Sequence, residues 1–152
     1  MSRFRIERTV ALPPAEVWRR ITDWPAHGAR IPFTSTTVLT PDPSGVGTRF
    51  TARTGLGRRL GFDDPMEVVR FEPPGSGPGT GVCGIVKLGR AVRGSAVFEV
   101  YEVPGGSGGP AASRVVWTEE LRLRGVPGWC DPVLAAVGRR LFARALDGLL
   151  GN

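Results

Sequence analysis

The apolar residues near the start of the chain alternate with polar ones. Phe4, Ile6 and Val10 recur at even positions over residues 3–10, and most of the residues between them are charged. Alternation with a period of two residues is typical of a β-strand that buries one face and exposes the other. The pattern therefore predicts a strand over residues 3–10.

Two short helices are expected directly after this strand. Pro14 suits the first turn of a helix, where a backbone N–H is not needed, and Val17 and Ile21 lie one turn apart on an apolar face. This helix is expected to end near residue 22. The Trp-Pro pair that follows restarts the chain, and residues 25–29 are expected to form a second brief helix.

From residue 34 onward the period changes back to two, and segments of alternating residues are separated by breaks rich in Gly, Pro, Asp and Ser. These breaks fall at 41–45, 55–64, 73–79, 89–90 and 104–110. The break at 55–64 allows either a continued hairpin or a rim loop. The expected strands are 34–40, 48–54, 66–71, 80–88, 91–103 and 113–124.

The last segment has helical spacing. Asp131 and Pro132 fit the N-cap and first-turn positions, and apolar residues then recur every three or four positions up to residue 150. We therefore expect one long terminal helix. Small residues on its apolar side, such as Gly138, would let the helix lie close to a sheet or leave space beneath it.

Composition limits the class of protein. A chain of 152 residues is expected to form one domain, spanning residues 1–152. The net charge is +6, and nineteen of the twenty basic residues are Arg, with Lys87 as the only lysine. These arginines form no tail or stripe, so we expect no nucleic-acid partner.

Cys83 and Cys130 are far apart and a single histidine is present, so no metal site is expected. We find no secretory or membrane-spanning segment and expect a cytoplasmic protein.

Two charged residues lie at positions where the pattern predicts apolar ones. Glu119 shares its strand face with Trp117 and Leu121, and Arg8 shares the face of Ile6. A buried and unpaired carboxylate costs several kcal/mol. Glu119 is therefore expected to be paired, protonated, or in contact with water or a ligand, and Arg8 is its candidate partner if the first and last strands are neighbours.

The opening residues carry a resemblance to a known superfamily. The segments Ala-Leu-Pro-Pro-Ala-Glu-Val-Trp at 11–18 and Asp-Trp-Pro at 23–25 resemble the start of the START, Bet v 1 and polyketide cyclase superfamily (SRPBCC). The order of one strand, two short helices, six strands and a long helix is similar to its helix-grip fold. The resemblance implies an α+β fold in which a seven-stranded antiparallel sheet curves around the C-terminal helix, with an apolar cavity that opens near the two short helices.

Members of this superfamily differ in function, so the resemblance leaves alternatives open. The first expectation is binding of a hydrophobic small molecule, a lipid, quinone or polyketide-like compound, with no cofactor. The second is an enzyme of the polyketide aromatase/cyclase type, which catalyses aldol cyclisation and dehydration. The third is a partner-binding or co-chaperone-like module. Ligand identity, turnover, protein partner and oligomeric state stay open.

Candidate site residues follow from these expectations. Glu119, Arg53 and His27 are the candidates for catalysis. For His27, a solvent-facing or capping role is the ordinary expectation. Arg49 and Arg53 are expected to point outward if Phe50 faces inward. The residues expected to bind the ligand are Trp24, Phe33, Phe50, Phe98, Trp117, Glu119 and Phe142.

Overall fold

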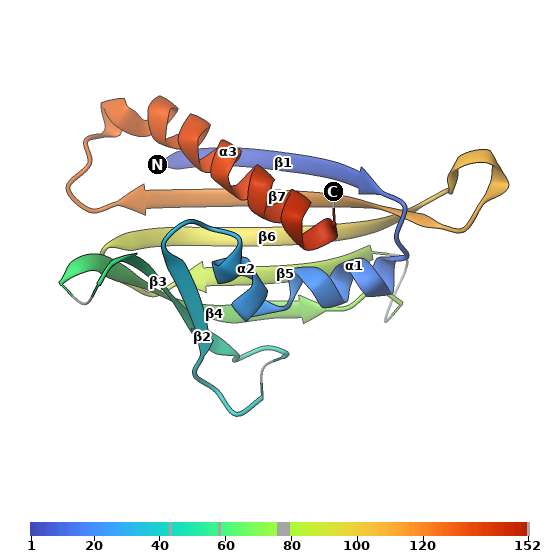
Figure 1. The fold of residues 1–152 in the computed structure, drawn as a ribbon, viewed down its shortest axis with the longest axis horizontal. Helices are drawn as coiled ribbons and strands as arrows, with labels where there is room; N and C mark the ends of the chain where they lie inside the picture. The colour runs from blue at the N-terminus through green and yellow to red at the C-terminus, as the bar shows by residue number, and fades with distance from the viewer. Residues whose placement is uncertain (43, 58, 76–79, 152) are drawn as a thin grey trace.

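One curved antiparallel sheet makes up most of the molecule, and its helices lie on one face (Figure 1). The computed structural model describes residues 1–42, 44–57, 59–75 and 80–151. The elements within these residues are β1 (Ser2–Val10), α1 (Pro14–Ile21), α2 (Trp24–Ala29), β2 (Thr34–Val38), β3 (Arg49–Leu56), β4 (Leu60–Glu72), β5 (Thr80–Lys87), β6 (Val92–Val103), η1 (Gly106–Gly108), β7 (Ala112–Leu123), η2 (Gly128–Cys130) and α3 (Asp131–Leu150).

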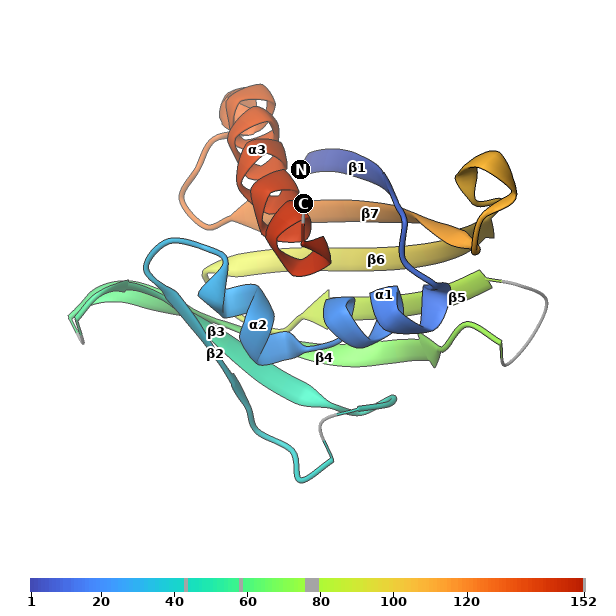
Figure 2. The same ribbon diagram turned by 45° about the vertical axis from the view of Figure 1, so that its right-hand side comes forward.

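The sheet places the first and last strands side by side. Its seven described strands follow the order β1-β7-β6-β5-β4-β3-β2, and each strand is antiparallel to its neighbours. Helix α3 crosses the sheet on the side of β1 and β7, and α1 and α2 lie beside it toward β2 (Figures 1 and 2). The predicted helix-grip architecture is therefore confirmed.

The predicted strands and helices are present, with most ends shifted by one or two residues. The largest difference is β4, which begins at Leu60, so most of the break predicted at 55–64 is hairpin. Gly55 and Gly61 lie opposite each other there, and a Cβ on Gly55 would come within 2.1 Å of the Leu60 carbonyl oxygen. Only glycine permits this approach. The predicted turns at 41–45 and 73–79 lie partly outside the described residues.

Helix α3 begins one residue earlier than expected. Cys130 takes the N-cap position, and Asp131 is the first helical residue. The Asp131 carboxylate accepts a hydrogen bond from the Ser2 hydroxyl at 3.3 Å, which ties the start of α3 to β1. In the described part of the chain, no helix combines the length and apolarity that a membrane span requires.

The core lies between the concave face of the sheet and the helices. Val17 and Ile21 from α1 are fully buried, as are Phe98 of β6 and Leu146 of α3. Val17 and Ile21 form the apolar face that the sequence predicts for the first helix. This arrangement fills the α1 end of the fold with packed side chains and leaves a cavity toward the other end.

Candidate functional site

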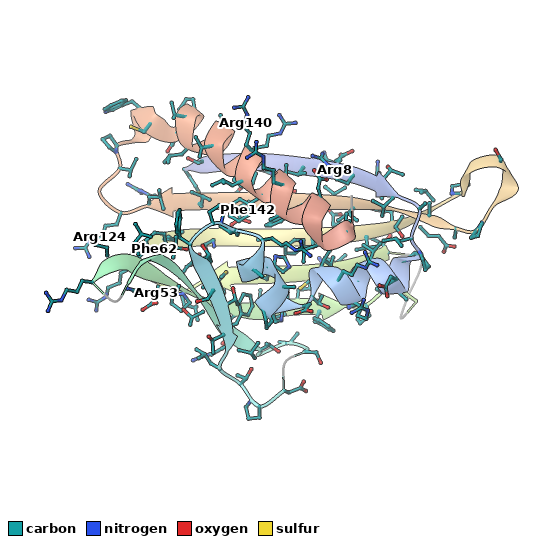
Figure 3. All side chains as sticks on the ribbon, in the orientation of Figure 1. Arg8, Arg53, Phe62, Arg124, Arg140 and Phe142 are labelled. Atoms are coloured by element: carbon teal, nitrogen blue, oxygen red, sulfur yellow. The ribbon has the colours of Figure 1, made fainter. Side chains whose placement is uncertain are left out.

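A cavity of about 280 Å³ lies between the concave face of the sheet, α2 and the first half of α3. Phe62 of β4 and Val137 and Leu141 of α3 line it and are also exposed, at 40%, 51% and 37% of their surface. They therefore mark its mouth, and Figure 3 shows Phe62 near the end of the β3–β4 hairpin. The other residues that line it include Gly28, Ile31, Thr34, Thr36, Ala52, Thr54, Met66, Ile85, Val92, Ala96, Leu121, Leu123, Leu134 and Gly138.

Aromatic rings form two parts of the cavity wall. Trp24 stacks on Phe50, with ring centroids 4.6 Å apart and planes within 6° of parallel. On the other side, Trp117 contacts both Phe98 and Phe142, with centroid distances of 4.7 and 5.0 Å. Flat rings in offset or tilted contact present broad apolar faces. The wall therefore suits a ligand that contains rings.

Three charged side chains meet inside this apolar cavity. Lys87 Nζ lies 2.6 Å from Asp64 Oδ2 and 3.5 Å from Glu119 Oε1, and all three side chains are at most 12% exposed. The indole nitrogen of Trp117 donates a hydrogen bond to Glu119 Oε2 at 2.8 Å. We refer to Asp64, Lys87 and Glu119 as the buried ion cluster.

The register of the sheet explains how the buried ion cluster forms. On β6, Gly94 is paired with Lys87 of β5, and Ala96 is paired with Glu119 of β7. These two small residues leave the space between β5 and β7 open above β6. The long Lys87 side chain crosses this space to reach Glu119, and it reaches Asp64 on β4 from the other side.

Burial and charge act together on the cluster. Burial raises the pKa of Glu119, and the neighbouring Lys87 and the Trp117 hydrogen bond oppose this only in part. Burial alone would lower the pKa of Lys87, but the carboxylates of Glu119 and Asp64 outweigh it and raise the pKa overall. We conclude that Lys87 is held as an ammonium ion and that Glu119 takes up a proton more readily than an exposed glutamate.

His27 lies in the cavity wall, so the solvent-facing role expected for it is wrong, whereas its contact with Ile21, the last residue of α1, fits the expected capping role. Its Nε2 donates to the Ile21 carbonyl at 2.6 Å, and its ring contacts Trp24, Phe98 and Trp117. Burial lowers the pKa of this imidazole, and the Ile21 hydrogen bond opposes the effect only in part. The ring is therefore neutral near pH 7, with its proton on Nε2.

The expected contact between Arg8 and Glu119 does not form. Arg8 Nε instead donates to Asp147 of α3 at 2.7 Å, in a pair about one-third exposed at the side of the helix (Figure 3). Strands β1 and β7 are neighbours, but Glu119 is paired with Phe4 and Arg8 with Val115. The two charges are therefore four residues apart along the strand.

Two further candidates lie outside the cavity wall. Arg53 is on the outer face of β3, where it pairs with Asp63 at 3.5 Å, and Arg49 on the same face pairs with Glu67 at 2.6 Å. The outward orientation of both arginines is confirmed. Phe33 is 69% exposed and borders a separate surface hollow. The other expected ligand-binding residues, Trp24, Phe50, Phe98, Trp117, Glu119 and Phe142, do line the cavity, and their contact with a ligand remains a prediction.

Sequence reasoning missed Asp64 and Lys87. Asp64 lay in a segment interpreted as a break. Lys87 shares strand parity with the buried residues Cys83 and Ile85, and it is the only lysine in a chain with nineteen arginines. A single lysine at an inward strand position was therefore the signal in the sequence for a buried charge.

Cys83 lies buried in β5. Burial raises the pKa of the Cys83 thiol to about 12, so it is not a nucleophile near pH 7. Within the same residues, no group of three or more His, Cys, Asp and Glu side chains is placed to hold a metal ion.

Comparison with known proteins gives a family match in sequence and further matches in fold. The family model described as "Polyketide cyclase / dehydrase and lipid transport" matches residues 1–150. No curated protein matches the sequence.

Similar solved structures cover nearly the whole chain. A Thermus thermophilus protein is 18% identical, with a TM-score of 0.63 over 98% of this chain and 94% of its own. A Chromobacterium violaceum protein is 14% identical, with a TM-score of 0.61 over 99% and 96% of the two chains. A hypothetical protein of Helicobacter pylori is 16% identical, with a TM-score of 0.72 over 99% and 86%. At these identities the likeness concerns the fold.

Proposed function

The chain belongs to the polyketide cyclase / dehydrase and lipid transport family, and on this premise we propose that its cavity binds an apolar small molecule that contains rings. A lipid-, quinone- or polyketide-like compound fits this description. The observation that carries the proposal is the cavity of about 280 Å³, with aromatic side chains on two sides and a mouth bordered by apolar residues. Concave and mainly apolar sites with few polar groups are typical of small-molecule binding.

A matched pair of variants tests this proposal. Ala52 lines the cavity, whereas Thr51 does not line it and points to the other face of β3. Ala52→Phe is expected to fill part of the cavity and to weaken binding of naphthalene, measured by equilibrium dialysis, by about tenfold or more. Thr51→Phe controls for added bulk and should bind as the unmodified protein does. Equal affinity in both variants would contradict the proposal. Native mass spectrometry of the purified protein would then identify any retained ligand.

An enzyme of the cyclase/dehydrase type is the second candidate, and the buried ion cluster favours it. Loss of water from a β-hydroxy ketone needs a base that takes the α-proton and an acid that protonates the departing hydroxide. Asp64 and Glu119 provide two carboxyl groups in different environments, and Lys87 provides a positive charge for a developing enolate. Turnover of a β-hydroxy ketone to the enone, followed by mass spectrometry, should disappear in Glu119→Gln. It should persist in Glu120→Gln, whose side chain pairs with Arg3 at the surface.

A further inference from the structure

Two buried polar atoms in the cavity wall have no hydrogen-bond partner among the described residues. They are Nε1 of Trp24 and Oδ1 of Asp64. As whole residues, Trp24 is 2% exposed and Asp64 is 8% exposed. Buried side-chain donors and acceptors are nearly always paired, because an unpaired one loses its hydrogen bond to water without replacement. Two such atoms in one cavity therefore call for an explanation.

The two residues that carry these atoms lie in the same part of the cavity wall. Trp24 stacks on Phe50 of β3, and the next inward residue of β3, Ala52, is paired with Asp64 of β4. Both Trp24 and Asp64 line the cavity. Ala52 lines the cavity as well, so the two side chains border the same corner of it.

The chemistry of each atom defines what it needs. An indole N–H only donates, so Trp24 needs an acceptor such as a carbonyl oxygen. The other oxygen of Asp64, Oδ2, accepts from Lys87 at 2.6 Å, so Oδ1 is the free acceptor of an ion-paired carboxylate. It needs a donor such as a hydroxyl group. A ligand carboxylate is disfavoured at this position, because it would face Asp64 with a like charge.

We propose that the cavity selects a neutral hydroxy-carbonyl compound that contains rings, with its hydroxyl donating to Asp64 Oδ1 and its carbonyl accepting from Trp24 Nε1. This inference rests on the proposed binding function, and it adds the polar groups of the ligand and the residues that recognise them. Asp64 and Trp24 are then the specificity-determining residues. The aromatic wall supplies affinity for any ring of suitable size.

Three related probes separate the hydrogen bond to Asp64 from the hydrogen bond to Trp24. Naphthalene has neither polar group, 2-naphthol adds a donor, and 2-acetonaphthone adds a carbonyl. We expect the protein to bind 2-naphthol and 2-acetonaphthone each about tenfold more tightly than naphthalene, by equilibrium dialysis, since each would satisfy one buried atom. If naphthalene binds and the two polar probes show no preference, this inference is wrong and the binding function stands. If none of the probes binds, the proposed function itself fails.

Two variants assign each preference to one residue. Trp24→Phe removes the N–H and keeps a ring against Phe50, so it should abolish only the preference for 2-acetonaphthone. Asp64→Leu removes the acceptor and leaves Lys87 beside Glu119, so it should abolish only the preference for 2-naphthol. Because both residues line the cavity, each preference is measured as the ratio of polar-probe to naphthalene affinity within the same variant, and circular dichroism reports that each variant folds.

Control variants lie outside the cavity. Trp18→Phe changes an indole that packs against Phe71, and Asp63→Leu changes an exposed carboxylate next to Asp64. Both should keep the preferences of the unmodified protein. Loss of either preference in a control to the same extent as in the cavity variant would overturn the assignment.

Discussion

Lys87 and Asp64 form an ion pair inside a mainly apolar cavity, with Nζ 2.6 Å from Oδ2 and the two side chains 6% and 12% exposed. The only lysine of the chain therefore lies in the wall of the candidate site. Glu119 lies on the other side of the same ammonium. The stability and the pH response of the protein should therefore depend on these few groups.

Loss of the ammonium should be costly. Lys87→Met leaves the Asp64 carboxylate buried without its counter-charge, and we expect the free energy of unfolding to fall by about 3–5 kcal/mol in urea denaturation. Arg8→Met is the control, because Arg8 and Asp147 are each about one-third exposed. Its cost should stay below about 1 kcal/mol. A Lys87→Met protein as stable as the control would show that the buried pair is not formed.

Glu119 should make stability depend on pH. Its folded pKa is raised above 4.5, so the native state keeps a proton that the unfolded state has lost. Stability from this group therefore falls as pH rises from 4.5 through the folded pKa. The difference in unfolding free energy between the unmodified protein and Glu119→Gln should decrease over this range. A difference that increases with pH would contradict the raised pKa.

His27 should behave as a neutral imidazole in the cavity wall. Because its folded pKa is lowered below 6.5, the stability it contributes is complete above pH 6.5 and is lost as pH falls through the folded pKa. As the chain has one histidine, its NMR titration is unambiguous. We expect a neutral ring with the proton on Nε2 at pH 6.5, and an ordinary titration near pH 6.5 in urea. An ordinary titration in the folded protein would contradict this placement.

Gly94 should not tolerate a side chain. It has φ of +142°, and a Cβ there would lie 1.8 Å from the backbone oxygen of Glu120. Gly94→Ala should therefore lower the unfolding free energy by about 2 kcal/mol or more. Gly106→Ala, where a Cβ meets open space, is the control and should change it by less than about 0.5 kcal/mol. Equal effects would show that β6 does not approach β7 as described.

The order of elements was predictable from the sequence because each element carries its own local pattern. The alternation at residues 3–10 and the helical spacing at 131–150 depend only on which face is buried. The start of β4 was not predictable in this way, because Asp63, Asp64 and Pro65 are residues typical of turns and Asp64 takes an inward position where alternation predicts an apolar residue.

The site was predictable only in part. The alternation of inward and outward positions along the last strand identified Glu119 as a buried charge. It could not identify Lys87 as the partner, because that contact depends on sheet register and on the small residues Gly94 and Ala96 between the strands. The same alternation predicted that Arg8 is buried, because Arg8 shares a strand face with Ile6. Strand alternation does not show that Arg8 lies beside α3, where Asp147 and solvent reach it.

Mapping of a bound probe by NMR tests the central claim most directly. Titration of ¹⁵N- and methyl-labelled protein with 2-naphthol should shift the signals of Ala52, Ile85 and Ala96, which line the cavity. Signals of Thr51 and Val97, which do not line it, should move little. Saturable shifts confined to the first group would support an internal binding site. Shifts centred on the second group, or no saturable shifts, would contradict it.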